Sequence, residues 1–186
     1  MIFLWIILGL IVAIALLGGV LFLVLKSMGE KIPVEHTATS FIVVPAAPEK
    51  VFEAVADIQS HTEWAKGTTR VHMLPEKDGM QQARVHQGHN SFILLRTRCD
   101  PPKLLERTIS DDHAHFSGTW LYKFAPVAGS LEGRAGTEVR LTETGRVNNP
   151  VFRAIMKRFF GYHTYTHKHL ESLARKFGGK AKAHRA

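Results

Sequence analysis

An uncharged apolar run at the amino terminus constrains this chain more than any other feature. Of the 25 residues from Met1 to Leu25, only Gly9, Gly18 and Gly19 are not hydrophobic. As a helix the run reaches about 36 Å, which exceeds the roughly 30 Å of a bilayer's hydrocarbon core. A cleavable signal peptide would show a positive amino-terminal region, a shorter apolar stretch and a cleavage site of small residues. The run lacks these features, so we predict a transmembrane helix over 1–25 and a polar linker over 26–36.

The charges that follow the run indicate its orientation. Lys26 and Lys31 lie directly after it, and positive residues tend to stay on the cytoplasmic side of a membrane. We therefore expect a single-pass membrane protein whose carboxyl-terminal domain lies in the cytoplasm. The remaining 161 residues hold every charged side chain, and this length suits one domain with its own hydrophobic core.

The net charge of +8 is concentrated at the carboxyl-terminal end of the chain. Residues 146–186 contain ten basic side chains and one acidic side chain, so this stretch carries +9 and the rest of the chain −1. Such a stretch suits nucleic acid or anionic lipid, and a membrane anchor favours lipid over nucleic acid. We predict a membrane-surface contact at Arg153, Lys157 and Arg158. We predict that 178–186 is a basic flexible tail, and a tail that only keeps the protein soluble is the alternative to a membrane contact.

The middle of the chain predicts a sheet preceded by two helices. Pro48 opens an amphipathic helix that carries Val51, Phe52 and Val55 on one face, and a short helical turn is expected over 59–66. Short polar connections between the strands indicate an antiparallel meander. The strands are expected at 37–44, 68–74, 80–87, 90–99, 104–110, 116–124 and 137–144.

The last element is predicted as one long helix over 150–177. Asn149 is a favourable cap, Pro150 suits the first helical position, and Gly178 is a favourable stop. One stripe at alternating spacings of four and three residues runs along the helix: Phe152, Met156, Phe159, His163, Thr166, Leu170, Leu173 and Phe177. A sheet of this size and a helix with one such stripe predict an α+β domain in which the sheet wraps around the helix.

Three stretches carry a resemblance to a known family. They are 41–64, with its Pro45-Ala46-Ala47-Pro48-Glu49-Lys50 turn and Trp64, then 118–143, and finally 143–162 with its Asn148-Asn149-Pro150 turn. In this order they resemble the START-like (SRPBCC) superfamily, in its polyketide cyclase/dehydrase and lipid-transport branch, over 37–177. The resemblance implies a helix-grip (START/Bet v 1-like) fold with a deep apolar cavity between the sheet and the terminal helix. It also implies that a hydrophobic small molecule binds there, but fold alone leaves the ligand open.

Several residues are candidates for the wall of such a cavity. Along 116–124, Trp120 and Tyr122 share the aromatic face of the strand, and plain core packing is the alternative for both. His163 and Thr166 are the polar exceptions on the stripe of the last helix and could meet polar atoms of a ligand. The predicted ligand-binding set is Trp64, Phe92, Trp120, Tyr122, Phe159, His163 and Thr166.

Other chemistry is not indicated. His163 and His167 are four residues apart, but neither a glutamate base nor a third ligand accompanies them, so no metal site is predicted. The chain lacks a nucleophile elbow, a phosphate-binding glycine loop and a dinucleotide fingerprint, and no cofactor is expected. The single Cys99 excludes an intramolecular disulfide. Arg96 and Arg98 could offer a cation to a ligand if their strand face points inward, although solvent exposure is the usual arrangement.

Three functions follow as hypotheses. The first is a membrane-anchored protein that binds a lipid or a quinone-like molecule without covalent chemistry. The second is a cyclase/dehydrase-type enzyme in which His163 and Tyr122 transfer protons on a polyketide-like substrate, which requires the two side chains to converge. The third is a ligand-free interaction module that docks at the membrane through its basic helix. Neither the oligomeric state nor a protein partner is indicated by the sequence.

Overall fold

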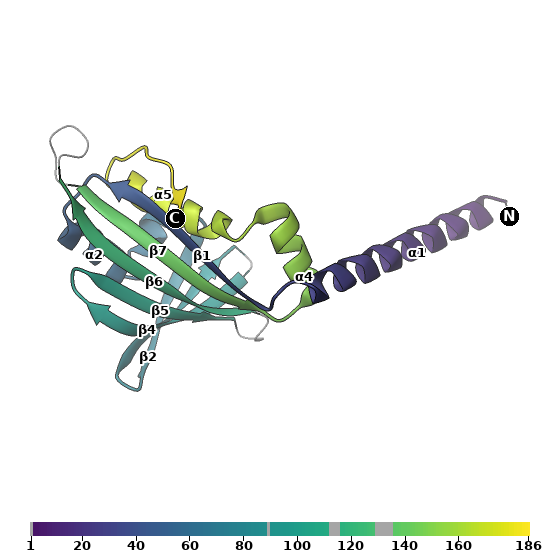
Figure 1. Cartoon of the computed structure of the whole chain (residues 1–186). Coiled ribbons are helices and arrows are strands. Elements are labelled where there is room, and N and C mark those ends of the chain that lie inside the picture. Colours follow the sequence, from purple (N-terminus) through teal and green to yellow (C-terminus); the bar gives the residue numbers. More distant parts are fainter. Residues whose placement is uncertain (1, 89, 112–115, 129–135) are drawn as a thin grey trace. The chain divides into compact units, whose positions relative to one another are not determined.

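The chain forms two compact units in a computed structural model that describes residues 2–88, 90–111, 116–128 and 136–186 (Figure 1). We call Met1–Val34 together with Val147–Gly161 the anchor unit. Glu35–Arg146 together with Tyr162–Ala186 form the sheet unit. The boundary at 161/162 falls inside the helix predicted over 150–177, so the two halves of that segment belong to different units.

The anchor unit is built on one long apolar helix, α1 (Ile2–Glu30). This helix is long and apolar enough to cross a membrane, and it continues five residues beyond the predicted end at Leu25. It is joined by α4 (Pro150–Ile155) and a π-helical turn, η1 (Met156–Phe160). Gly29 lies where a Cβ atom would collide with the carbonyl of Pro150. The absent side chain at Gly29 therefore lets α4 pack directly on the end of α1.

The sheet unit holds an eight-stranded sheet in the order β2-β3-β4-β5-β6-β7-β1-β8. Each consecutive strand from β2 to β7 lies beside the next, as the short connections predict, and β1 closes the series by pairing antiparallel with β7. The strands are β1 (Glu35–Val44), β2 (Thr68–Lys77), β3 (Met80–Gln87), β4 (Asn90–Asp100), β5 (Leu104–Ser110), β6 (Phe116–Val127), β7 (Gly136–Val147) and β8 (His184–Arg185).

Three helices accompany this sheet: α2 (Pro48–Ala56), α3 (His61–Trp64) and α5 (His163–Lys176). The core forms where α5 and α2 cover the inward side chains of the strands. Leu170 and Leu173 of α5 are fully buried together with Ile42 of β1 and Leu141 of β7. The predicted helix-grip fold is confirmed, and α5 is the helix that the sheet grips.

The prediction of one helix over 150–177 is wrong. The segment is divided into α4, η1 and α5, and η1 ends in a 2.7 Å hydrogen bond from the amide of Gly161 to the carbonyl of Met156. Gly161 has φ of 73°, a left-handed conformation that glycine adopts without strain and that stops a helix. The apolar spacing continues across this break, which is why periodicity alone did not reveal it.

The last residues of the chain form part of the fold. In the stretch predicted as a flexible tail, β8 pairs antiparallel with β1 and matches Ser40 with Arg185. Ala183 is buried and belongs to the main core cluster. The segment after α5 therefore covers the outer edge of β1.

Candidate functional site

The aromatic side chains of β6 line the inner face of the sheet. Tyr122 and Phe124 are buried in the main core cluster, whereas Phe116 and Trp120 are half-buried and pack against a second cluster that includes Ile58. The alternation along β6 therefore places the aromatic face inward, as the strand period predicts.

His169 of α5 contacts two of these aromatic side chains, Tyr122 and Trp120, and two side chains of α3. The Nε2 atom of His169 lies 3.1 Å from the hydroxyl oxygen of Tyr122, within hydrogen-bonding distance. The ring centroid of His169 is 5.1 Å from those of Trp64 and Trp120 and 5.8 Å from that of His61. We call this set of five side chains the aromatic cluster. It joins α3, α5 and β6 inside the sheet unit.

A buried arginine accompanies the aromatic cluster. Arg107 of β5 is 3% exposed and lies directly across from Trp120 in the sheet register. Its Nη2 atom donates a 2.9 Å hydrogen bond to the carbonyl of Ala56. A guanidinium has five N–H donors, yet among the described residues this carbonyl is its only hydrogen-bond acceptor. The interior therefore contains a cation with donors to spare.

Burial sets the protonation states around this arginine. It lowers the pKa of Arg107 to about 10, so that the guanidinium stays charged at neutral pH. Burial, and then the charge of Arg107, lowers the pKa of His169 to about 3 and holds that of His61 well below its usual value. Burial also raises the pKa of Tyr122. At neutral pH the aromatic cluster thus offers neutral rings and a phenol, and Arg107 beside it adds one fixed positive charge.

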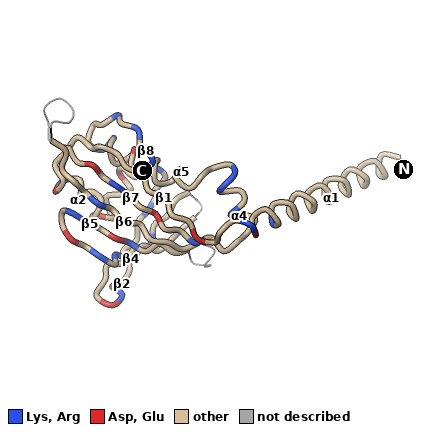
Figure 2. Tube along the Cα trace, in the orientation of Figure 1, with Lys and Arg blue, Asp and Glu red and all other residues tan. Residues whose placement is uncertain are grey.

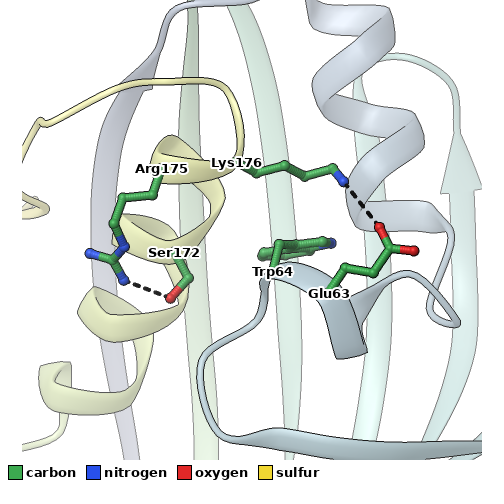
Figure 3. A pocket seen from close by; sticks show the side chains of 5 residues that line it. All are labelled: Glu63, Trp64, Ser172, Arg175 and Lys176. Carbon is green, nitrogen blue, oxygen red and sulfur yellow. Dashed lines mark hydrogen bonds and ion pairs between the residues drawn. The ribbon is translucent and has the colours of Figure 1, made fainter.

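Trp64 connects the aromatic cluster to the surface. It lines a pocket of about 360 Å³ together with Glu63, Ser172, Arg175 and Lys176 (Figure 3). Lys176 forms an ion pair of 3.8 Å with Glu63, and Arg175 donates a 2.9 Å hydrogen bond to Ser172. The Nε1 atom of Trp64 is buried and has no hydrogen-bond partner in the described part of the chain. Buried polar groups are normally hydrogen-bonded, so an indole N–H without a partner is a donor that the fold leaves unsatisfied.

A second group of polar contacts lies at the start of α5. The hydroxyl of Ser40 lies 3.0 Å from Nδ1 of His163 and 2.9 Å from the hydroxyl of Thr166. Nearby on β7, the Glu143 carboxylate accepts a 3.1 Å hydrogen bond from Nε1 of Trp120. The two predicted polar residues of the stripe therefore face the interior of the sheet unit, but their contacts are with protein groups.

The enzyme hypothesis required Tyr122 and His163 to converge. The structure pairs Tyr122 with His169 and His163 with Ser40 instead. The described contacts therefore do not bring the predicted proton-transfer pair together.

The remaining predicted ligand residues lie in different places. Phe92 of β4 is half-buried and packs against the second core cluster, as Trp120 does. Phe159 belongs to the anchor unit and is 72% exposed. The unit that contains Phe159 does not contain the aromatic cluster.

The three predicted membrane-surface residues differ in their exposure to solvent. Lys157 and Arg158 are exposed in η1. Arg153 is buried, and its guanidinium donates hydrogen bonds of 2.8 to 3.1 Å to the carbonyls of Gly29, Val147 and Asn148. Arg153 thus ties α4 to the end of α1, and its charge does not face a surface.

Sequence reasoning missed His169, His61 and Arg107. His169 lies three residues after Thr166 and four before Leu173, so its helical spacing offered a usable signal. Arg107 lies on the same face of β5 as Leu105 and Ile109, and both of these neighbours are buried. That shared face was the available signal for an inward arginine. Arg96 and Arg98, by contrast, lie toward the end of β4, and Arg98 is exposed.

Comparison with known proteins agrees with this architecture. Residues 35–178 match the family described as polyketide cyclase / dehydrase and lipid transport. A search of the curated proteins finds no match.

Three solved structures show the same fold. The Zhui aromatase/cyclase from Streptomyces sp. R1128 is 18% identical, with a TM-score of 0.57, over 77% of this chain and 94% of that one. A conserved protein from Geobacillus kaustophilus is 14% identical, with a TM-score of 0.62, over 80% and 99%. A START superfamily protein from Mycobacterium smegmatis is 16% identical, with a TM-score of 0.58, over 77% and 97%. At these identities the likeness shows the fold alone.

Proposed function

Because this chain belongs to the polyketide cyclase/dehydrase and lipid transport family, we propose that its sheet unit binds an apolar molecule that carries a hydrogen-bond-accepting oxygen. The observation that carries the proposal is Arg107, a buried cation beside the aromatic cluster with a single acceptor among the described residues. Burying a charge costs several kcal/mol unless it is compensated. A ligand carboxylate or carbonyl at Arg107 would supply that compensation.

The proposed ligand lies along the aromatic side chains of the inner sheet face. Trp64, Phe92, Trp120 and Tyr122 would contact its apolar part, and the oxygen would lie toward Arg107. Trp64 lines the surface pocket and also contacts His169, so it is the proposed gate between solvent and the interior. His163 and Thr166, which both contact Ser40, would border the site at the start of α5.

The anchor unit gives this binding its place in the cell. We assign α1 as a single transmembrane span and the sheet unit to the cytoplasmic side, since Lys26 and Lys31 follow the apolar run. Apolar molecules concentrate in membranes, so a tethered binding domain would meet them at high local concentration. The proposed protein is therefore a membrane-anchored carrier or sequestering protein for a lipid or quinone-like molecule.

Photo-cross-linking tests this proposal directly. The full chain in mild detergent is irradiated with palmitic acid that carries a diazirine on its acyl chain, and the labelled peptides are mapped by mass spectrometry. We expect labels on peptides that contain Trp64 or Trp120, and excess unlabelled palmitic acid should suppress them. Label on α1 serves as an internal control, because partitioning along a lipid-exposed helix should resist competition. Label confined to α1 would contradict the proposal.

The second candidate function is a cyclase/dehydrase-type enzyme. It is favoured by the 3.1 Å contact between Tyr122 and His169, which could pass a proton to or from a bound carbonyl compound. The opposed pKa directions of these two groups make that transfer costly at neutral pH. Incubation with a poly-β-ketone substrate separates the two functions. An enzyme would form a cyclised product lighter by one water and would lose that activity on Tyr122→Phe, whereas a binding protein would return the compound unchanged.

A further inference from the structure

A second pocket lies within the anchor unit, where α1 ends. It has a volume of about 480 Å³. Met28, Lys31 and Ile32 line it from the end of α1 and the residues just after it, and Ala154, Lys157 and Arg158 line it from α4 and η1. The Gly29 contact with Pro150 and the hydrogen bond from Arg153 to Gly29 hold these two walls together.

The lining combines apolar side chains with unpaired cations. Met28, Ile32 and Ala154 are apolar, while Lys31, Lys157 and Arg158 are exposed. In the described part of the chain none of these three cations forms an ion pair with a carboxylate. The exposed neighbour Glu30 offsets part of the positive charge. The pocket thus retains an excess of positive charge next to apolar surface.

The position of the pocket favours a lipid as its occupant. Met28 follows the apolar run by three residues, which is about 4.5 Å along the helix axis, so the pocket would lie at the level of the lipid headgroups if α1 spans the bilayer. Phe159 and Phe160 of η1 are 72% and 57% exposed. Exposed aromatic rings beside cations are typical of segments that rest in the membrane interface. Figure 2 shows the charged residues of this unit at the end of α1 and along α4 and the turn that follows.

We propose that this pocket binds one anionic phospholipid. Lys31, Lys157 and Arg158 would contact the phosphate and the anionic headgroup, and Met28 and Ile32 would contact the start of an acyl chain. The proposal rests on the membrane attachment proposed above, but it concerns the anchor unit and is independent of the ligand in the sheet unit. Basic pockets beside membrane spans recognise anionic headgroups through this combination of contacts.

Native mass spectrometry of the full chain in mild detergent tests the site. Phosphatidylglycerol and phosphatidylcholine are titrated separately, and the retained lipid is counted. We expect one phosphatidylglycerol to be retained in preference to phosphatidylcholine, and excess inorganic phosphate should not displace it. The double variant Lys157→Ala/Arg158→Ala should reduce retention about tenfold or more, since each basic residue near an anionic lipid contributes about 1 kcal/mol.

A variant with the same change of charge provides the control. Lys180→Ala/Lys182→Ala removes two exposed cations from the sheet unit and should leave lipid retention unchanged. Equal losses in the two double variants would mean general electrostatic attraction and would overturn the site. Equal retention of both lipids by the unaltered chain would overturn it as well. Labelling by the diazirine fatty acid near Trp64 should be the same in all these variants. A failure of the lipid site in the anchor unit can therefore be distinguished from a failure of the function proposed for the sheet unit.

Discussion

Replacing Arg107 with methionine should weaken capture of the fatty-acid probe by the sheet unit about tenfold or more without destabilising the fold. The buried guanidinium has one acceptor among the described residues, so its removal relieves a desolvation cost of several kcal/mol. The carbonyl of Ala56 loses its partner, which costs about 1 kcal/mol. We expect the free energy of unfolding of Arg107→Met to be unchanged or higher by up to about 3 kcal/mol, as for other buried charges replaced by apolar side chains.

The loss of binding should be large because the charge is the specific contact. A charge-assisted hydrogen bond to a ligand oxygen contributes about 1.5 to 3 kcal/mol, which corresponds to at least about a tenfold loss of affinity. Competition by unlabelled palmitic acid at the Trp64 and Trp120 peptides measures the affinity, and urea unfolding measures the stability. A purely structural arginine would give the opposite pair of results, with stability lost and residual labelling retained. Arg98→Met, at an exposed position of β4, is the control and should change neither quantity.

Acidification should destabilise the sheet unit through His169. Burial, followed by the charge of Arg107, lowers the pKa of His169 to about 3, whereas an unfolded histidine titrates near 6.5. The unfolded chain therefore binds the proton more readily, and the stabilisation is complete above about pH 6.5 and lost as the pH falls toward 3. Between about pH 7.5 and about pH 5.5 this single group should account for up to about 1.4 kcal/mol of lost stability.

The variant His169→Gln isolates this contribution. Urea unfolding of the full chain in mild detergent, followed by tryptophan fluorescence, should show a smaller loss of stability between the two pH values than in the unaltered chain. The part of the pH-dependent loss of stability that is due to His61 should remain, because the pKa of His61 is also lowered mainly by burial. His72→Gln, at an exposed position of β2, should keep the full pH dependence. An unchanged pH dependence in His169→Gln would mean that His169 is not held neutral by the fold.

Much of the sheet unit was predictable because the residue pattern within each strand and the short connections between strands indicate the same fold. Alternating β-branched and aromatic residues specify the strands, and short connections specify the antiparallel order from β2 to β7. The aromatic face of β6 was predicted to point inward, and burial of Tyr122 confirms it. The resemblance to the START-like superfamily rested on the same order of elements, and the family match over 35–178 confirms it.

The end of the chain was less predictable because two kinds of signal disagree there. The apolar spacing from Phe152 to Phe177 describes one continuous face, whereas Gly161 interrupts the backbone. The residues before the break pack with α1, an interaction that periodicity within one segment does not encode. Arg153 illustrates the difference: its charge suggested a membrane surface, but three backbone carbonyls enclose its guanidinium.

The candidate site was partly predictable for a similar reason. Trp64, Trp120 and Tyr122 could be selected because large aromatic residues on an inward face are conspicuous in a sequence. Arg107 and His169 are polar residues among apolar neighbours, and only the pairing of β5 with β6 and the packing of α5 bring them together. A contact made by three separate elements has no signature in any one of them.

The central claim is that the sheet unit holds an apolar molecule at Arg107. Native mass spectrometry of the full chain, gently released from mild detergent, measures this most directly. The predicted result is an adduct of one apolar molecule with a carboxylate or carbonyl oxygen, present in the unaltered chain and in Lys157→Ala/Arg158→Ala but about tenfold or more weaker in Arg107→Met. A chain that carries no adduct, or the same adduct in Arg107→Met, would contradict the claim.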